Sequence, residues 1–227
     1  GYSECWGDLG NREHHVFDLY YGGSVRNKEK GFYLDDLISI GKTDLFDIDV
    51  NVLKGDKKEV GKNAVRQILQ IEKTKKNIEW KSEELDVLID TLPYPLHFID
   101  FETYIGAVPF HKYMRPYELI AFQWSCHTIP SKGAAPIHNE WIHTGSQLPD
   151  PNAFPNFEFA NSLMKHIGNT GTPFMWATHE NTVLRTILNQ FDHYNYSNSE
   201  LEEWLLTTTS DSKTKREGRL IDMNRMT

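Results

Sequence analysis

Two carboxylates stand two positions apart in a short apolar segment. Residues 96–102, Leu-His-Phe-Ile-Asp-Phe-Glu, predict a β-strand that carries Asp100 and Glu102. Alternate strand residues point to the same face, so both carboxylates leave the sheet together while Ile99 and Phe101 pack on its other side. Two like charges side by side in a buried strand are costly unless a cation neutralises them. The pattern therefore predicts a divalent metal held by oxygen ligands, as in phosphoryl transfer or phosphodiester hydrolysis.

The spacing of these two acids is weak evidence without its context. With 32 acidic residues among 227 positions, an Asp-x-Glu spacing is expected about once by chance. This occurrence lies in an apolar strand that follows a proline break, where solvated surface carboxylates are least expected. We therefore favour the metal site over a structural pair of acids.

Two further acids are candidates for the same site. Glu180 lies in Trp176-Ala-Thr-His-Glu-Asn, where a strand ends and a helix begins, and such strand ends are where sites usually form. Glu180 can equally be a first-turn acid favoured by the helix dipole, with Thr178 as the cap. His179 is a ligand, a base or, as we favour, a loop residue. Asp222 is a single acid within the apolar segment Leu220 to Met223, and its position alone decides nothing.

Composition limits the classes of protein. The net charge of −8 argues against non-specific coating of nucleic acid, although site carboxylates contribute to it and a basic patch, residues 54–81, coexists with it. No apolar run approaches the roughly 20 residues that span a bilayer, and no secretory leader opens the chain. We expect no membrane partner and a cytoplasmic location. Cys5 and Cys126 are expected to be free thiols, with a metal or cluster ligand as the alternative for Cys5.

The chain is expected to be a fragment of a longer protein, because it starts at Gly1 without Met and stops just after an apolar segment. We divide it into an N-terminal region, residues 1–92, and a second domain, residues 93–227. The first 50 residues predict one or two short strands with turns and a small helix at 34–38. Helical spacing then predicts helices over 59–74 and 82–92.

The second domain has alternating and then helical patterns. The strand at 96–102 is followed by predicted strands at 118–128 and 136–143, a helix at 156–167, a strand at 174–177 and a helix at 181–191. Ser199 and Glu202 have the spacing of a capping box that opens one more helix. The polar stretch 207–218 is typical of a mobile linker. Three strands, a helix, a strand and a helix indicate an α/β fold with a mixed sheet.

Several ordered blocks resemble one family. The segments 95–103, 115–127, 177–184 and 218–223 are similar, in this order, to blocks of the bacterial proteins grouped as domain of unknown function 2779. That family is regarded as distantly related to the DnaQ-like 3'–5' exonucleases of the ribonuclease H fold. The resemblance implies a ribonuclease H-like mixed sheet flanked by helices, incomplete at the C-terminus. It also suggests that residues 1–92 begin with the tail of an upstream RecB-like nuclease region.

The resemblance also implies roles for the acids. Asp100 and Glu102 match the first exonuclease motif, Glu180 stands where relatives often have Asp, and Asp222 lies in a shared block. Two Mg or Mn ions would be held by Asp100, Glu102 and Glu180, and the implied partner is a single-stranded end of DNA or RNA. The last acidic motif of DnaQ-like enzymes has no counterpart before the chain stops.

Two alternatives to the nuclease remain, and a group of aromatic residues bears on how a nuclease would hold its substrate. Tyr104, Phe110 and Tyr113 follow the first motif and suit stacking of a terminal base, although such residues more often pack in cores or loops. A module of the same fold that binds nucleic acid or acts as a scaffold, without cutting, fits Glu180 in place of Asp. A glycoside hydrolase also uses paired carboxylates, but this chain has no room for a barrel of typical size.

Overall fold

The computed structural model describes residues 2–22, 34–54, 59–144 and 154–226. The chain divides into two compact units, Gly1–Ser82 (unit 1) and Glu83–Thr227 (unit 2). The helix at 83–91 groups with unit 2. Among the helices in the described ranges, none is long and apolar enough to cross a membrane.

Unit 1 is built from helices and helical turns. Its elements are α1 Tyr2–Trp6, η1 Gly7–Asn11, η2 Val16–Asp18, α2 Leu34–Ser39, η5 Leu45–Asp47, α3 Val50–Lys54 and α4 Lys62–Lys75. The predicted helix near 34–38 is confirmed. The predicted strands are wrong for the described part of unit 1, where His15 and Asp44 form only an isolated bridge. Both residues instead cap 3-10 turns through capping boxes with Asp18 and Asp47, which satisfies the backbone locally.

The long helix of unit 1 packs on these turns. The predicted helix at 59–74 is confirmed as α4, which buries Gln67 and Ile71. Gln67 Nε2 donates to the Tyr20 carbonyl at 2.7 Å, so a buried amide on α4 fixes the chain after η2. The small core of unit 1 consists of Val16, Leu19, Leu37, Leu45, Ile48 and Ile71. Cys5 in α1 is an exposed free thiol.

Unit 2 contains one five-stranded mixed sheet. Its strands are β1 Leu96–Ile105, β2 Leu119–Ile129, β3 Ile137–Ile142, β4 Thr172–Met175 and β5 Ile221–Asp222, in the order β3-β2-β1-β4-β5. β2 is antiparallel to β1 and β3, whereas β4 is parallel to β1 and β5. The predicted mixed α/β architecture is therefore confirmed, and it is consistent with a ribonuclease H-like fold.

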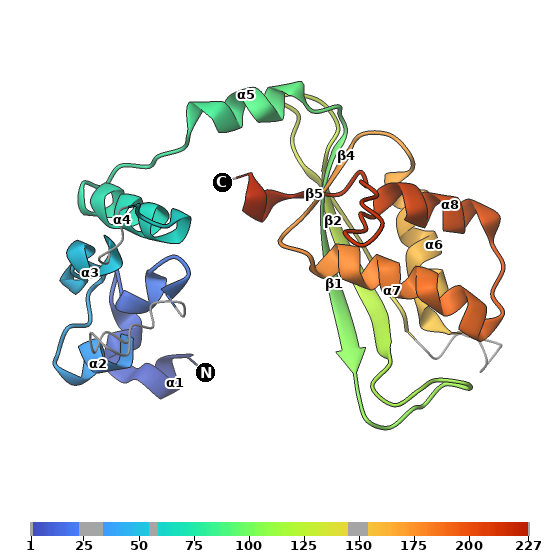
Figure 1. The fold of residues 1–227 in the computed structure, drawn as a ribbon, viewed down its shortest axis with the longest axis horizontal. Helices are drawn as coiled ribbons and strands as arrows, with labels where there is room; N and C mark the ends of the chain where they lie inside the picture. Colours follow the sequence, from blue (N-terminus) through green and yellow to red (C-terminus); the bar gives the residue numbers. More distant parts are fainter. Residues whose placement is uncertain (1, 23–33, 55–58, 145–153, 227) are drawn as a thin grey trace. The chain divides into compact units, whose positions relative to one another are not determined.

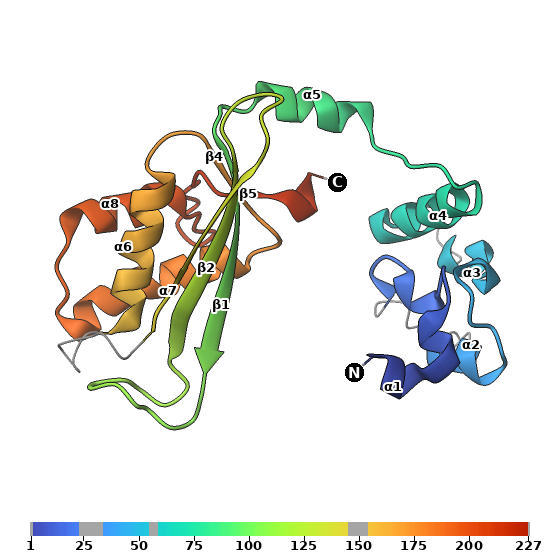
Figure 2. The ribbon, with the colours of Figure 1, turned by 180° about the vertical axis from the view of Figure 1, so that it is seen from behind.

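Helices cover one side of the sheet. α6 Pro155–Ile167, α7 His179–Tyr194 and α8 Ser199–Thr208 lie on the same side in Figure 1, and Figure 2 shows the same arrangement from behind. α5 Glu83–Thr91 precedes β1 and confirms the helix predicted at 82–92. The core between sheet and helices is apolar and includes Ile99, Phe101, Trp124, Phe159, Leu163, Leu184, Ile187 and Trp204. The cap of α8 is Asn198, whose side chain accepts from the Leu201 N–H, and not the predicted Ser199.

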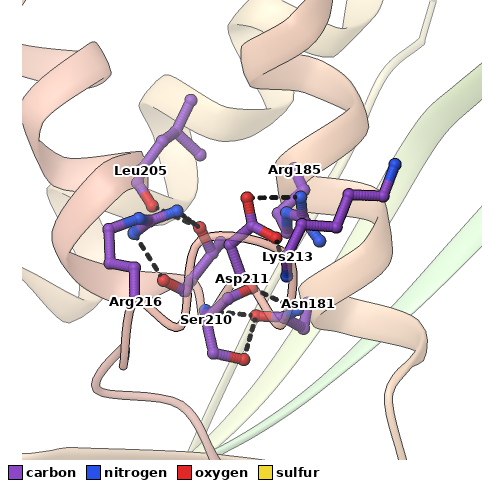
Figure 3. Close-up of polar contacts among 8 residues, drawn as sticks. Asn181, Arg185, Leu205, Ser210, Asp211, Lys213 and Arg216 are labelled. Atoms are coloured by element: carbon purple, nitrogen blue, oxygen red, sulfur yellow. Dashed lines mark hydrogen bonds and ion pairs between the residues drawn. The ribbon is translucent and has the colours of Figure 1, made fainter.

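The segment that joins α8 to β5 is held by side chains. Asn181 on α7 accepts from the Ser210 N–H at 2.8 Å and donates to the Ser210 carbonyl at 3.1 Å (Figure 3). Arg185, one turn further along α7, pairs with Asp211 at 2.9 Å. Arg216 Nη1 donates to the Thr209 carbonyl at 2.6 Å. The prediction of a mobile linker at 207–218 is wrong, because these polar side chains bond to one another and to α7.

Gly218 lets this segment turn back onto α8. A Cβ at this position would lie 2.3 Å from the Thr209 carbonyl carbon, closer than packed atoms approach. The backbone then continues to Arg219, whose N–H donates to the Thr207 carbonyl at 3.1 Å. Since β5 follows directly, these contacts place Asp222 relative to α7.

The Asn181 contacts give a first prediction. Asn181→Ala leaves both backbone groups of Ser210 without their partner and should lower the free energy of unfolding by roughly 1–3 kcal/mol. Urea unfolding followed by circular dichroism measures this change. Limited trypsin digestion should then cut faster at Lys213 and Lys215, because the segment is no longer tied to α7.

The matched control is Asn189→Ala, an exposed asparagine on the same helix. It should change stability by less than about 0.5 kcal/mol and leave the digestion rate unchanged. Equal stability and equal digestion of the two variants would contradict a holding role for Asn181.

Candidate metal-dependent active site

The first two acids share one face of β1. Ile99 and Phe101 are buried against the helices, as predicted, while Asp100 and Glu102 point to the other face of the sheet. The prediction that the two carboxylates are buried is wrong, because both side chains are exposed. Strand alternation therefore places them together, but on a solvated face.

A register irregularity lies beside Glu102. Glu102 pairs with Gln123, but the next residue, Thr103, pairs with Ala121, so Phe122 is an extra residue on β2. Its carbonyl accepts from the His143 N–H at 2.7 Å. Bulges of this kind bend a strand and redirect its side chains, and they are common next to active sites.

Strand pairing brings Asp222 to the same end of the sheet. Phe98 pairs with Phe174 and Phe174 with Ile221, so Asp222 and Asp100 lie one and two residues beyond the paired positions. Asp222 Oδ1 accepts from the Asn224 N–H at 3.0 Å. Asp222 Oδ2 pairs with Arg225 Nε at 3.2 Å. This third acid therefore caps a 3-10 turn, η6 Met223–Arg225, as well as facing the candidate site.

Glu180 is the buried acid of the group. α7 begins at His179, so Glu180 lies in its first turn, and its side chain is only 3% exposed. Its Oε2 atom is buried with no hydrogen-bond partner in the described structure. Burial raises its pKa to about 7, a hydrogen bond from its own backbone N–H opposes the rise, and the charges of Asp100 and Asp222 add to it. Thr178 is the N-cap without a side-chain bond, and His179 is exposed.

The structure thus connects three of the four predicted acids. The electrostatic coupling joins Glu180 to Asp100 and Asp222, whereas Glu102 makes no contribution to the raised pKa. Carboxylate oxygens are the ligands that Mg²⁺ and Mn²⁺ prefer, and the buried Oε2 of Glu180, which has no partner among the described residues, has the chemistry of such a ligand. As the side chains are placed, the described residues contain no group of three that could hold a metal ion. Metal binding therefore requires the side chains of the acid group to move closer together than they lie at present.

Two features of the turn into α7 were not predicted. Trp176 directly follows β4 and is 57% exposed, at the end of the sheet that carries Asp100. Ala177 next to it has a positive φ of 63°, a region that residues with a side chain seldom adopt. A bulky aromatic residue immediately after an apolar strand was the available signal for an exposed ring. Strained backbone of this kind is often found at functional sites.

The described residues also form a cavity away from these acids. It measures about 360 Å³ and lies between the C-terminal end of α6 and α8, with Met164, Trp204 and Arg219 among its lining residues. None of the four predicted site residues lines it. This cavity is therefore separate from the carboxylates of the candidate site, of which Asp100 and Glu102 are exposed.

Comparison with known proteins gives a family. The fold and site define a mixed α/β domain with clustered carboxylates at the end of its parallel strands. A family described as "Domain of unknown function (DUF2779)" matches residues 97–223, which is more than half of the 227 residues, and the chain belongs to it. No curated protein matches, and no solved structure does. The family match spans Asp100, Glu102, Glu180 and Asp222.

The buried acid makes the stability of the metal-free chain depend on pH. The pKa of Glu180 rises from 4.5 to about 7 on folding, so the folded chain holds this proton more tightly than the unfolded chain. The stability that protonated Glu180 contributes is therefore fully present below pH 4.5 and is lost as the pH rises through about 7. Glu180→Gln should unfold with wild-type stability near about pH 4 but be more stable by roughly 1–3 kcal/mol near about pH 8.

Urea unfolding in EDTA across this pH range measures the difference. Glu217→Gln, which changes an exposed carboxylate, should follow the wild-type curve at every pH. A Glu180→Gln variant that also parallels the wild type throughout would show that Glu180 is not a desolvated acid.

Proposed function

We propose that this chain is a metal-dependent nuclease that hydrolyses phosphodiester bonds in DNA or RNA, related to the DnaQ-like 3'–5' exonucleases, with a cytoplasmic location. The observation that carries the proposal is Glu180. Burial raises the pKa of its carboxyl, the charges of Asp100 and Asp222 add to the rise, and one of its oxygens has no partner among the described residues. A divalent cation would neutralise the repulsion among the three acids and would give the unpartnered oxygen of Glu180 a contact.

The roles of the side chains follow from their positions. Asp100, on the central strand, and Glu102 would hold divalent cations from the exposed face of β1, and Glu102 would also help to position the attacking water. Glu180 would complete the ligand set from α7, and Asp222 would contribute from the neighbouring strand end. Two bound Mg²⁺ or Mn²⁺ ions would supply an activated water and stabilise the leaving 3' oxygen.

The solvated face of β1 suits such a substrate. A polymer can reach Asp100 and Glu102 without entering a closed pocket, because both side chains are exposed. The other face of β1 packs against the hydrophobic core, which holds the strand and therefore its two acids in place. Rigid support of this kind is what positioning of reactive groups requires.

A second candidate function is a module of the same fold that binds nucleic acid or serves as a scaffold but does not cut. The ion pair between Asp222 and Arg225 favours it, because an arginine already balances one of the three coupled acids. Arg225 itself is 79% exposed, so a cation could still displace it at low cost. The two candidates differ in whether a metal ion bound at the acids leads to cleavage of the nucleic acid.

The experiment combines metal binding with cleavage. Calorimetric titration with Mn²⁺ should show binding to the wild type that Asp100→Asn and Glu180→Gln each weaken strongly. Incubation of end-labelled single-stranded DNA and RNA with Mn²⁺ should give products whose rate of formation falls at least about 100-fold in both variants.

Asp192→Asn is the matched control, since Asp192 is an exposed acid at the other end of α7. It should keep wild-type binding and cleavage. Manganese binding without any cleavage by the wild type favours the inactive module. A wild type that neither binds the metal nor differs from Asp100→Asn in cleavage excludes the two-metal nuclease.

A further inference from the structure

The connection between β1 and β2 exposes a group of aromatic side chains. Figure 1 shows it as a long excursion beyond the end of β1. We define the loop surface as Tyr104, Phe110, Lys112, Tyr113 and Tyr117; its aromatic side chains are 46–69% exposed. Exposed rings gathered on one loop commonly mark a site of interaction.

The charge of this segment is opposite to that of the whole chain. Residues 103–117 contain no Asp or Glu, although the average composition would place about two there. They contain Lys112 and Arg115, and Lys112 Nζ lies 5.1 Å from the centre of the Tyr113 ring. The carboxylate of Glu118, at the base of the loop, already accepts hydrogen bonds from the side chains of Gln190 and Tyr194, at 3.0 Å each. The loop surface therefore offers aromatic faces and positive charge together.

The backbone that carries the rings is fixed in a strained form. Tyr113 and Tyr117 have positive φ angles of 65° and 61°, although their side chains are largely exposed. Arg115 can only donate, so it donates to His193 Nδ1 at 2.8 Å, and His193 Nε2 in turn donates to the Tyr113 carbonyl at 2.8 Å. The Tyr117 N–H donates to the Gly106 carbonyl at 2.8 Å. These contacts hold the backbone of Tyr113 and Tyr117 at positive φ. Packing of the two rings does not impose this conformation, because both rings are largely exposed.

We propose that the loop surface binds an unpaired nucleic-acid strand, by stacking bases on its tyrosine and phenylalanine rings and by placing Lys112 and Arg115 near phosphates. Stacking on aromatic rings is the sequence-tolerant way of holding single strands, and cations between the rings suit the backbone. An apolar protein partner would not need the absence of acids. The inference rests on the proposed function for its geometry, since the segment starts directly after Glu102.

The distance between loop and acids sets the length of strand that can use both. His193 lies 13 positions after Glu180 on α7, which corresponds to about 20 Å. At about 3.4 Å per nucleotide, a strand needs on the order of six nucleotides to reach from Glu180 to the Tyr113 end of the loop surface, and fewer when stretched. Tyr104, two residues after Glu102 on β1, lies nearer to the carboxylates. The loop surface should therefore affect oligonucleotides but not small phosphodiesters.

Binding is tested with the 227-residue chain in EDTA, where no metal-dependent cleavage occurs. Fluorescence anisotropy with labelled single strands of about 12 nucleotides compares the wild type with Tyr113→Asn/Tyr117→Asn, in which asparagine tolerates the positive φ but lacks a ring. Affinity should fall roughly tenfold or more, whereas Tyr113→Phe/Tyr117→Phe should retain it within about twofold. Trp80→Ala removes an exposed ring of unit 1 and is the control, with affinity unchanged.

Hydrolysis of bis(p-nitrophenyl) phosphate with Mn²⁺ separates this inference from the proposed function. The Tyr113→Asn/Tyr117→Asn variant should retain wild-type turnover of this small diester, whereas Asp100→Asn should lose it. If neither the wild type nor any variant hydrolyses this diester but strand binding still depends on the rings, the proposed nuclease activity is wrong and the proposed role of the loop surface is kept. Strand binding that is unchanged in a folded double asparagine variant overturns the loop surface, as does a wild type that binds no single strand or that only self-associates through these rings.

Discussion

The alternation of side chains along β1 is the constraint on which the rest of unit 2 depends. Its odd-numbered residues Ile99 and Phe101 are buried and join the core under the helices, so Asp100 and Glu102 must lie on the other face. A shift of pairing by one residue would bury both charges and expose both apolar side chains, which the buried core forbids. The same apolar contacts that stabilise the sheet therefore also determine where its acids point. The direction of the two acids is thus set by the burial of their neighbours, and Asp100 adds only a local hydrogen bond, which it accepts from the Phe101 N–H.

Glu180 experiences the opposite environment, and the contrast explains why it dominates the electrostatics. Asp100 and Glu102 keep their hydration on an exposed face, whereas Glu180 loses it at the start of α7. A desolvated carboxyl next to two acids favours a proton or a metal cation over the free ion, which is the direction of its raised pKa. A nuclease needs a metal cation at this carboxyl, whereas an inactive module of the same fold can hold either a cation or a proton there. Mg²⁺ or Mn²⁺ would relieve all three acids, whereas a proton relieves only one.

Sequence patterns predicted those parts of the structure that depend on local periodicity. The strand with Asp100, the strand after it and the helices α6 and α7 bury regular stripes of apolar residues, and each lies close to its predicted position. β3, α4 and α5 also lie close to their predicted positions, although β3 and α5 contain no buried residue. The burial of Glu180 was beyond reach, because it depends on the packing of α7 on the sheet. The segment 207–218 has a linker's composition, yet its order arises from contacts with Asn181 and Arg185 on another helix. The strands predicted for unit 1 were wrong because the polar residues that commonly flank strands here form capping boxes, which close 3-10 turns.

Helix α7 connects the three segments on which a catalytic role would depend. Its first turn carries Glu180, its second holds the segment leading to Asp222 through Arg185, and its last holds the β1–β2 loop through His193 and Tyr194. Its inward stripe, Val183, Leu184, Ile187 and Phe191, is buried against the core, so the helix cannot rotate without exposing it. A single rigid element thus sets both the position of Glu180 and the position of the loop that carries Tyr113. Because an α-helix has a fixed rise, the spacing between the two is also fixed, and a strand bound at both must span that length.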